Sequence, residues 1–511
     1  MLSKIISSAV IGVDAYLVDV ETNISNGLPH FSTVGLPDNA VRESKERVEA
    51  AIKQSGFQYP YKRITINLAP ANIRKAGSAF DLPIAIGMLS ATGQIQSNLL
   101  DTYLIIGELS LDGSLRPIKG VLPIAVHAGL EMKGLLLPTE NAEEAAMVNG
   151  LKVYGFKNLA EVVGFLNCDC HVNPYEIDRT TLFNRSVPSS IDFIDVKGQN
   201  HVKRAIEVAA AGSHNLLLIG PPGSGKTMLA RRLPSILPDM TWPEALETTK
   251  IHSVAGLMSG KASLIARRPF RAPHHSISDA GLIGGGSYPS PGEVSLSHNG
   301  VLFLDELPEY KKNVLELLRQ PLEDGHVSIA RASTTLTYPA RFTLVSAMNP
   351  CPCGYFGDPD HECSCTPPQI QRYMAKISGP LLDRIDLHIE VPAVPFKALS
   401  DSSSGDTSEM IRHRVNETRQ RQLKRFIKHK GIFCNAHMES RDIRRFCQVN
   451  QQGHDLLRNA MTKLGLSARA YDRILKVSRT IADLAIEEEI LVDHVSEAIQ
   501  YRVLDRTMWR H

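Results

Sequence analysis

The sequence predicts an α/β fold followed by a helical C-terminal region, and three observations lead to this prediction. Two short apolar runs, Leu216–Ile219 and Val301–Leu304, have the length and composition of buried parallel strands, and each ends in a polar or glycine-rich motif. Residues 1–166 alternate β-like runs with helical ones. From Thr407 onward the pattern is helical, most clearly at 474–484, where apolar residues recur at spacings of three and four.

The chain has 511 residues, which is too long for one hydrophobic core and suggests about three domains. Residues 63–68 and 103–106 are expected to be strands, and residues 39–54 and 81–92 are expected to be helices. The expected order is an N-terminal α/β domain (1–166), a linker (167–190), a core domain (191–394) with a cysteine-rich insertion (351–365), and a C-terminal helical domain (407–511).

Composition excludes several classes of protein. The chain is 43% hydrophobic and 22% charged with a net charge of only +2, so its overall charge does not indicate nucleic-acid binding. No apolar run approaches the ~18–20 residues of a membrane span. The eight cysteines fall mostly in close pairs, which is not typical of a secreted disulfide scaffold of this length. We therefore expect a cytoplasmic protein.

The first motif is a phosphate-binding loop that directly follows the first apolar run. It reads G-P-P-G-S-G-K-T and consists of Gly220, Pro221, Pro222, Gly223, Ser224, Gly225, Lys226 and Thr227. Glycines allow backbone N–H groups to surround an anion, and the N-terminus of the following helix adds positive potential. Lys226 is expected to reach the β- and γ-phosphates of ATP, and the Thr227 hydroxyl to bind Mg²⁺.

Three polar residues at predicted strand ends complete a hydrolytic set. Asp305 and Glu306 follow the second apolar run, and Asn349 follows the predicted strand at 343–348. Asp305 suits a magnesium contact, directly or through water, and Glu306 suits a base that polarises the attacking water. Asn349 suits the positioning of that water. The sequence therefore predicts ATP hydrolysis.

The order of these motifs resembles the ATPase superfamily called AAA+, whose fold is a P-loop NTPase core with a helical lid. Arg384 lies on a short polar turn, where an arginine most often forms a surface ion pair. The resemblance implies a different role, in which Arg384 projects into the ATP site of a neighbouring subunit. Arg469 resembles the second sensor arginine, which contacts ATP in its own subunit, although Arg473 lies one turn further along the same predicted helix.

Two insertions narrow the class within this superfamily. Residues 268–286 resemble a helix-2 insert, and residues 323–338 read as a β-hairpin that resembles the one before the first sensor strand. In the clade of magnesium chelatases and replicative helicases such devices point into a central pore. Arg331 at the hairpin tip is then a candidate DNA contact, with a solvated turn as the alternative. For His274 and His275 a role in packing or at the insert tip is favoured over a metal site.

Four cysteines in the insertion form two C-x-C pairs: Cys351, Cys353, Cys363 and Cys365. Four thiolates within fifteen residues suit a tetrahedral Zn²⁺ that orders a loop without a core. Free or redox-active thiols are the alternative, and His361 is a substitute ligand. Cys168, Cys170 and His171 in the linker form a weaker second candidate.

The N-terminal region resembles the proteolytic domain of Lon-type proteases over 67–85 and 107–141. That family uses a Ser/Lys dyad, but here Ala79 occupies the nucleophile position and residues 120–129 contain no lysine. Ser78 and Lys119 are near misses that a one-residue shift would restore. We therefore expect a degenerate, non-proteolytic domain, similar to the scaffold domain of the recombination protein RadA.

The combination of these features resembles the ComM/YifB family of magnesium-chelatase-like proteins. The resemblance implies a homo-hexameric, ATP-driven DNA branch-migration helicase that acts on single-stranded and branched DNA during natural transformation. The basic run 411–430 either adds contacts to DNA phosphates or forms a solvated helix face. The alternatives are a chelatase-type motor that remodels a protein partner, an ATP-gated DNA scaffold and an AAA+ protease.

Overall fold

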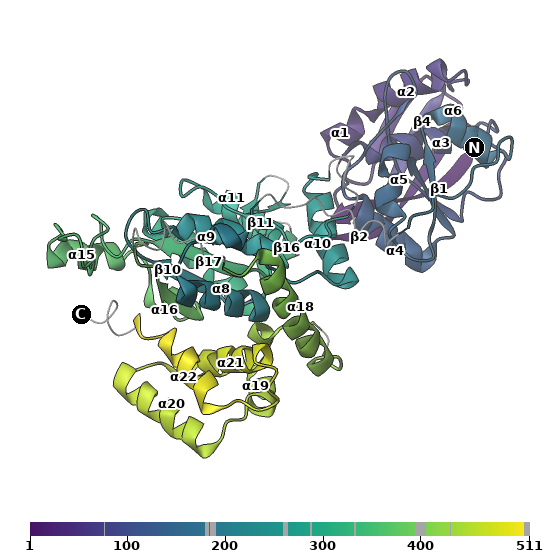
Figure 1. Ribbon diagram of the computed structural model, residues 1–511. Coiled ribbons are helices and arrows are strands. Elements are labelled where there is room, and N and C mark those ends of the chain that lie inside the picture. The colour runs from purple at the N-terminus through teal and green to yellow at the C-terminus, as the bar shows by residue number, and fades with distance from the viewer. Residues whose placement is uncertain are drawn as a thin grey trace. The chain divides into compact units, whose positions relative to one another are not determined.

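The computed structural model describes residues 1–75, 77–178, 183, 191–258, 264–286, 289–331, 334–394, 405–429 and 431–504, without the side chains of Arg331 and Thr334. The chain divides into two compact units. The first contains Met1–Arg185, Ala245–Ile265 and Ala330–Thr337, and the second contains Ser186–Glu244, Ala266–Ile329 and Tyr338–His511. Each unit is described by itself (Figure 1).

The first unit is built on a seven-stranded mixed sheet. Its strands, in spatial order, are β3 (His30–Val34), β4 (Arg63–Ala69), β2 (Asp14–Ser25), β1 (Leu2–Ile11), β5 (Tyr103–Ile105), β8 (Gly134–Pro138) and β9 (Lys152–Phe156). In β4 the residues Ile64, Ile66 and Leu68 are buried and alternate with more exposed ones, because successive side chains point to opposite faces of a strand. Between β5 and β8 the chain also forms a small separate hairpin, which consists of β6 (Glu108–Leu109) and β7 (Leu115–Arg116).

Two hydrophobic clusters form around this sheet, one containing Ile5, Val20 and Ile86 and the other containing Leu104, Val121 and Leu135. The helices are α1 (Asn39–Arg42), α2 (Ser44–Gln54), α3 (Asp81–Ala91), α4 (Val121–Glu131), α5 (Thr139–Ala145) and α6 (Leu159–Leu166). The predicted strands at 63–68 and 103–106 and the predicted helix at 81–92 are confirmed to within one residue. The helix predicted at 39–54 is confirmed but interrupted at Glu43.

The second unit contains a five-stranded sheet in which all strands are parallel. Its order is β11 (Phe270–Arg271), β14 (Val301–Leu304), β17 (Thr343–Met348), β10 (Leu216–Ile219) and β18 (Leu387–Glu390). Every residue of β10, β14 and β17 is buried, as expected for parallel strands covered on both faces. The two apolar runs singled out in the sequence are thus central strands.

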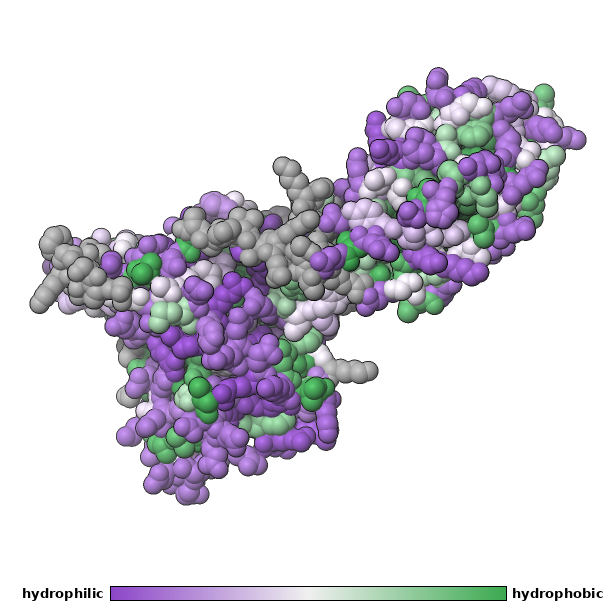
Figure 2. Space-filling view, turned by 45° about the vertical axis from the view of Figure 1, so that its right-hand side comes forward, coloured by the Kyte–Doolittle hydropathy of each residue, from purple (hydrophilic) through white to green (hydrophobic). Residues whose placement is uncertain are grey.

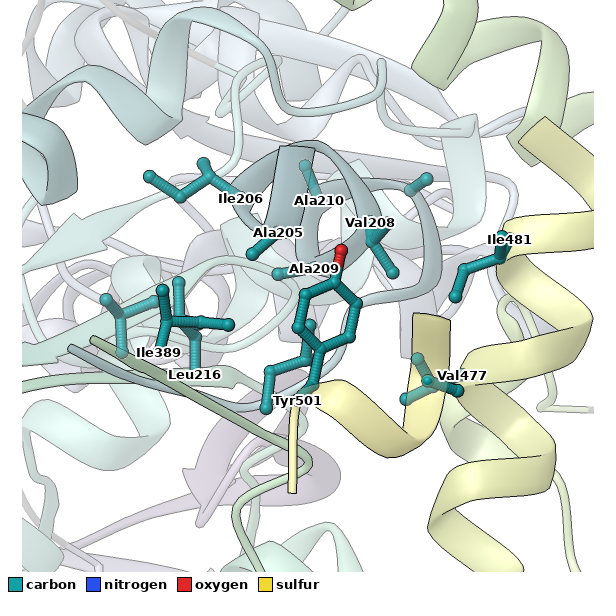
Figure 3. Packing of buried hydrophobic residues seen from close by; sticks show 14 of the residues in the cluster. Ala205, Ile206, Val208, Ala209, Ala210, Leu216, Ile389, Val477, Ile481 and Tyr501 are labelled. Carbon is teal, nitrogen blue, oxygen red and sulfur yellow. The ribbon is translucent and has the colours of Figure 1, made fainter. Parts of the chain in front are cut away.

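Helix α8 (Asn200–Gly212) joins this sheet to the C-terminal helices. Figure 3 shows its alanine- and valine-rich faces between Leu216 and Ile389 of the sheet and Val477 of the helical region. The other helices of the core sequence are α9 (Lys226–Arg232), α10 (Trp242–Val254), α11 (Asp279–Ile283), α12 (Glu293–Leu296), α13 (Lys312–Leu317), α14 (Arg319–Asp324), α15 (Pro367–Met374) and α16 (Gly379–Leu382).

Both predicted insertions have secondary structure of their own. The segment 268–286 contains β11 and α11 and ends in β12 (Gly284–Gly285), which pairs with β13 (Ser290–Pro291). The predicted hairpin is confirmed as β15 (His326–Arg331) and β16 (Thr334–Pro339). Arg331 ends β15, and its side chain lies outside the described part of the structure.

The C-terminal region is helical, as predicted, and forms one group in Figure 1. It consists of α18 (Ser408–Arg425), α19 (Ser440–Phe446), α20 (Gln451–Leu464), α21 (Ala468–Leu484) and α22 (Val492–Gln500). Thr407, Asn450 and Ser467 cap α18, α20 and α21 by accepting a backbone N–H bond in the first turn. The face of this group drawn in Figure 2 is mainly hydrophilic.

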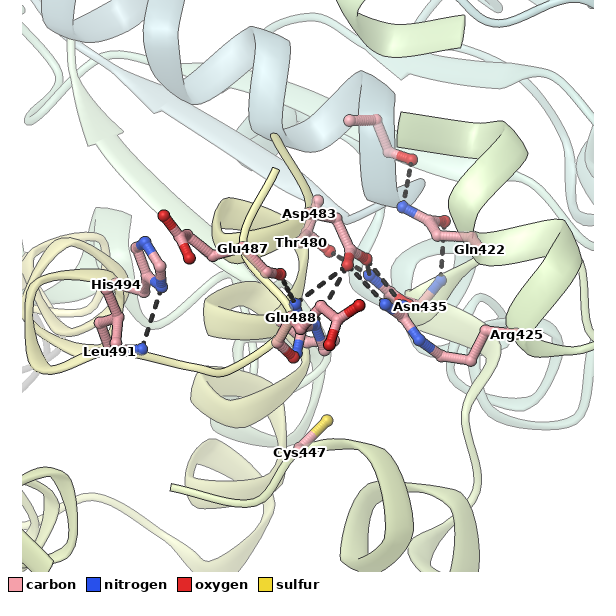
Figure 4. A network of polar contacts seen from close by, with 12 residues as sticks. Gln422, Arg425, Asn435, Cys447, Thr480, Asp483, Glu487, Glu488, Leu491 and His494 are labelled. Atoms are coloured by element: carbon pink, nitrogen blue, oxygen red, sulfur yellow. Dashed lines mark hydrogen bonds and ion pairs between the residues drawn. The ribbon is translucent and has the colours of Figure 1, made fainter. Parts of the chain in front are cut away.

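The basic run 411–430 is used largely within the chain. Arg425 forms a paired contact with Asp483, which also accepts a hydrogen bond from Asn435 (Figure 4). Arg419 is only 4% exposed and donates to the carbonyl of Ala211 at 3.2 Å. These side chains therefore hold the helices together, and neither alternative drawn from the sequence describes them. Within the described ranges, each helix is too short or too polar to cross a lipid bilayer.

Candidate nucleotide site and cysteine cluster

The phosphate-binding loop joins β10 to α9 at the carboxyl edge of the parallel sheet. Gly223 and Gly225 have φ angles of 75° and 91°, a region that side chains other than glycine rarely occupy. Gly220 is required for another reason: a Cβ atom there would lie 2.1 Å from the carbonyl oxygen of Val391. The loop is therefore held open by backbone geometry, with the N-terminus of α9 directed at its centre.

Lys226 lies in the mouth of this loop. Its Nζ donates to the carbonyl oxygens of Gly220 and Pro221 at 2.7 and 2.8 Å, and the residue is only 9% exposed. Burial lowers the pKa of Lys226 to about 8, against the opposing effect of Asp305. The lysine is thus held by weak neutral acceptors, which a phosphate group would replace favourably.

Thr227 and Asp305 meet across the loop, as expected for a magnesium site. The Thr227 hydroxyl donates to Oδ2 of Asp305 at 2.7 Å. Both groups offer oxygen ligands, which Mg²⁺ prefers, so the donor set fits this ion. When bound there with ATP, the ion would neutralise charge on the β- and γ-phosphates.

Glu306 directly follows Asp305 at the end of β14. Its φ angle is 53°, and the side chain is 65% exposed. Nδ1 of His275 lies 3.5 Å from Oε2 of Glu306. His275 was expected to have a packing or insert-tip role, but the structure brings it to the predicted base. The order of the motifs could not predict this contact, because His275 lies in the segment after β11 and Glu306 lies in the segment after β14.

The predicted residues Lys226, Asp305, Glu306 and Asn349 line one cleft of about 490 Å³. Its other lining residues were missed by the sequence analysis: Glu309, Met348, Pro352, Gln369, Arg372, Tyr373 and Lys376. Four of them lie at positions 369, 372, 373 and 376, a spacing that places side chains on one helical face. This spacing was the sequence signal for a shared helical face. Helix α15 and the two residues after it, 375 and 376, form one wall of the cleft.

Arg384 lies at the opposite edge of the same sheet. It precedes β18, and its carbonyl accepts a hydrogen bond from Asn215, which precedes β10. The phosphate-binding loop follows β10. Because β10 has four residues and a strand rises about 3.3 Å per residue, the two edges are roughly 13 Å apart.

Arg469 lies with Arg384 rather than in the cleft of its own chain. Nη2 of Arg469 is 3.2 Å from Oε1 of Glu323, and the other oxygen of Glu323 binds Arg384. The hydrogen bond from Arg384 holds the pKa of Glu323 below its usual range. Arg469, at the start of α21, thus lies on the side of the sheet that carries Arg384, and its contact with ATP stays a prediction.

Arg473 has a structural partner that distinguishes it from Arg469. Its guanidinium binds the buried Asp386, which also accepts a hydrogen bond from the Asn215 backbone at 2.8 Å. Burial alone would raise the pKa of Asp386, but Arg473 and His214 hold it well below its usual range. The ion pair of Arg473 with Asp386 thus links α21 to the residue that precedes β18 of the sheet.

The two C-x-C pairs come together as the sequence analysis expected. The sulfur atoms of Cys351, Cys353, Cys363 and Cys365 all lie within 4.8 Å of one another. Three of the separations are 3.3, 3.5 and 3.7 Å. Tetrahedral zinc with Zn–S bonds of about 2.3 Å requires sulfur separations of about 3.8 Å, so the cluster fits this ion.

The thiols differ in their proton affinity. A hydrogen bond from the Tyr355 backbone lowers the pKa of Cys353 to about 5. A hydrogen bond from the Cys365 N–H favours the thiolate of Cys363, but burial and the neighbouring thiols outweigh it and raise the pKa of Cys363. Crowding four thiols therefore opposes their joint ionisation, and a divalent cation would remove that conflict.

The weaker metal candidates are not supported by the structure. Among the described residues, the four-cysteine cluster is the one group of three or more His, Cys, Asp or Glu side chains close enough to share a metal ion. Cys168 and Cys170 are exposed, and His274 stacks on His275 with ring centroids 4.0 Å apart.

The near-miss residues of the N-terminal region have other partners. The Ser78 hydroxyl donates to Glu108, and the Lys119 side chain lies against Gly256. Asp81, on the next helix, is buried and binds Arg47 at 2.6 Å. These contacts provide no support for a Ser/Lys dyad formed by Ser78 and Lys119.

A parallel sheet with a phosphate-binding loop, an Asp–Glu pair and an asparagine at one edge defines an ATPase domain of the AAA type. The protein-family model described as magnesium chelatase, subunit ChlI, matches residues 192–399. The models for subunit ChlI of Mg-chelatase and for the ChlI C-terminal region match residues 20–141 and 405–502. The chain belongs to the ComM/YifB family of magnesium-chelatase-like proteins.

Relatives of similar length support this assignment. The competence protein ComM of Haemophilus influenzae is 46% identical over 511 residues, which cover 99% of this chain and 98% of that protein. The protein YifB of Escherichia coli is 43% identical over 511 residues with the same coverage. The magnesium-chelatase 38 kDa subunit of Rhodobacter capsulatus is 25% identical over 177 residues, 31% of this chain and 50% of that protein.

Proposed function

We propose that this protein is an ATP-driven DNA motor that assembles as a homo-hexameric ring and moves DNA branches during the integration of imported DNA. The name of the Haemophilus relative, a competence protein, supports the biological context. The AAA-type domain supports ATP hydrolysis with Mg²⁺. The DNA substrate and the ring are the parts that experiments must test.

The observation that carries the proposal is the separation of the catalytic groups. Lys226, Asp305, Glu306 and Asn349 lie at the carboxyl edge of the sheet, whereas Arg384 and Arg469 lie at its amino edge. An arginine at the amino edge cannot reach the cleft of its own chain. It can reach the cleft of a second copy, and head-to-tail contacts of this kind close into rings.

Each residue then has a defined part in hydrolysis. Lys226 binds the β- and γ-phosphates, Glu306 accepts a proton from the attacking water, and Asn349 orients that water. Arg384 and Arg469 of the adjacent subunit stabilise the charge that develops on the transferred phosphoryl group. Hydrolysis is thereby coupled to the subunit boundary, where a change of contacts can move one subunit against the next.

DNA is proposed as the transported partner through the β15–β16 hairpin. Arg331 ends β15, and a ring would carry one such arginine from each copy. Contacts of this kind bind the phosphate backbone without reading sequence. The N-terminal domain is proposed to be a Lon-like scaffold without peptidase activity, because Ser78 is bonded to Glu108.

The decisive experiment is branch migration of a four-way junction, or three-strand exchange, with ATP. Wild-type protein should move the branch and show DNA-stimulated ATP turnover. Lys226→Ala should lose both ATP binding and movement, and Glu306→Gln should bind ATP but not hydrolyse it. Absence of DNA stimulation together with an unmoved branch would refute the DNA motor.

A chelatase-type motor that remodels a protein partner is the second candidate, and the three family models favour it by description. The model for subunit ChlI of Mg-chelatase also matches residues 20–141, so the N-terminal domain is compatible with this candidate. Full-length identity to a competence protein favours the biological context in which the DNA motor is proposed to act. ATP turnover that responds to no DNA, but rises with a protein partner, would support the second candidate.

A further inference from the structure

The cysteine cluster lies directly against the phosphate-binding loop. A Cβ atom on Gly354 would lie 2.5 Å from Cδ of Pro222. Gly354 directly follows Cys353 and closes a turn by donating its N–H to the Cys351 carbonyl, so this turn and the phosphate-binding loop are in close contact. Pro352, between Cys351 and Cys353, lines the nucleotide cleft. A displacement of the cysteine cluster would therefore alter the conformation of the phosphate-binding loop that packs against it.

The same cluster sets the start of α15. Cys365 is followed at once by Thr366, whose backbone N–H donates to Oε1 of Gln369 at 2.9 Å in the first turn of the helix. Gln369, Arg372 and Tyr373 then face the cleft from one side of α15. The position of this wall thus depends on where the last cysteine is held.

The segment between the cysteines has little else to hold it. Within 351–365 only Cys351 and Gly354 are buried, and the remaining residues are partly or fully exposed. A loop that buries so few side chains cannot offset the entropy of ordering by hydrophobic contacts. A bound ion can supply that free energy instead.

Arg372 is the cation that this wall offers to a nucleotide. It lines the same cleft as Lys226, and among the described residues its guanidinium has no hydrogen bond or ion pair. The neighbouring Lys376 differs, because its Nζ lies 3.4 Å from Oε1 of Glu309. A planar guanidinium in this position suits bidentate contact with phosphate oxygens.

We propose that the four cysteines bind one Zn²⁺, that this ion fixes α15 against the nucleotide cleft, and that Arg372 contacts the phosphates of ATP from there. Zinc occupancy then sets the affinity for ATP. The ion remains structural, since four thiolates fill its coordination shell. The proposal rests on ATP binding at the Lys226 cleft, as proposed above.

The first test uses full-length protein and a fluorescent ATP analogue. We expect one zinc per chain, a rise in Kd of at least tenfold after chelation, and recovery when zinc is returned. The double variant Cys363→Ser and Cys365→Ser should reproduce the chelated state. The double variant Cys168→Ser and Cys170→Ser removes two exposed thiols of the other unit and should retain both zinc and ATP affinity.

The second test keeps the metal in place, so it is informative even where chelation unfolds the protein. Arg372→Ala should keep one zinc per chain and raise the Kd for the analogue about tenfold, since a charge-assisted hydrogen bond is lost. Arg458→Ala, an exposed arginine of α20, should leave the Kd unchanged.

The outcomes separate the two levels of inference. Zinc well below one per chain, an unchanged Kd without zinc, or an unchanged Kd for Arg372→Ala would each overturn this proposal. Zinc-loaded wild-type protein that binds ATP no better than Lys226→Ala would instead refute the nucleotide site itself.

Discussion

Glu323 binds Arg384 through a carboxylate oxygen and thereby keeps this arginine only 5% exposed at the amino edge of the sheet. The second oxygen of the same carboxylate binds Arg469. Arg384, in the turn before β18, and Arg469, in α21, thus bind the same carboxylate. Both lie at the edge of the sheet away from the phosphate-binding loop, and in the ring proposed above this edge would face the neighbouring copy.

Replacing Arg384 by alanine should leave ATP binding intact and reduce ATP turnover by about a thousandfold, the usual effect of losing an arginine supplied in trans. The measurement is steady-state hydrolysis beside the Kd of an ATP analogue. Arg319→Ala is the matched control, because this arginine is on the same helix as Glu323 but pairs with Glu316. Unchanged turnover in Arg384→Ala would show that the arginine is only a structural ion pair.

Removing the Thr227 hydroxyl should weaken magnesium binding. Thr227→Ala loses an oxygen that lies 2.7 Å from Asp305, so we expect at least a tenfold higher Mg²⁺ concentration for half-maximal ATP turnover. Thr227→Ser retains the hydroxyl and should behave as wild type. A magnesium dependence that is identical in Thr227→Ala and wild type would place the ion elsewhere.

ATP binding should take up a proton at alkaline pH. Burial lowers the pKa of Lys226 to about 8 in the free protein, and a bound phosphate favours the charged form. Because part of the lysine is neutral above pH 8, binding should take up about 0.8 proton at pH 8.5 and about 0.1 at pH 7.

Calorimetry in two buffers with different ionisation enthalpies measures this uptake. Affinity for ATP should accordingly fall as the pH rises above 8. An uptake of zero at pH 8.5 would mean that Lys226 is already fully charged in the free protein.

The ion pair between the buried Asp386 and the partly exposed Arg473 should contribute to stability at neutral pH. Arg473 and His214 hold the pKa of Asp386 well below its usual range, so the stabilisation is present above the unfolded pKa and is lost as the pH falls toward the folded one. Asp386→Asn should lower the free energy of unfolding by about 3 kcal/mol at pH 7, because it removes the buried counter-charge of the Arg473 guanidinium, whose side chain is 20% exposed.

Below pH 4 the difference between Asp386→Asn and wild type should become smaller, as the wild type loses its own stabilisation. Denaturant unfolding at pH 7 and at pH 3.5 measures both values. Asp383→Asn, three residues earlier in the chain, is the control and should change stability little. A difference that grows on acidification would contradict the assignment.

The sequence predicted the features that depend on neighbouring residues. The phosphate-binding loop, the strands β10 and β14 and the cysteine pairs are each encoded by adjacent positions, and they are observed where they were expected. The prediction did not reach contacts between distant segments. Arg372 lies 146 positions beyond Lys226 in the numbering. The spacing of residues 369, 372, 373 and 376 indicates a shared helical face, but it does not indicate that this face closes the cleft of Lys226.

Charge patterns were the least reliable guide. The run 411–430 was expected to face solvent or DNA. In the folded chain, however, Arg419 binds the carbonyl of Ala211 and Arg425 binds Asp483, and both partners are distant in the sequence. The contact of Arg469 with Glu323 could not be predicted for the same reason, since Glu323 lies on another helix. Periodicity shows which face of a helix is apolar, but it does not show which acid a basic side chain will meet.

The placement of Lys226 and Arg384 at opposite edges of one sheet has a genetic consequence for the proposed ring. A chain without Lys226 has a defective cleft but can still lend its arginine, whereas a chain without Arg384 has an intact cleft but cannot help its neighbour. Two inactive alleles expressed together would therefore restore some working boundaries. Either allele expressed beside the wild type would act as a dominant inhibitor, because each defective copy damages a boundary that it shares with a normal one.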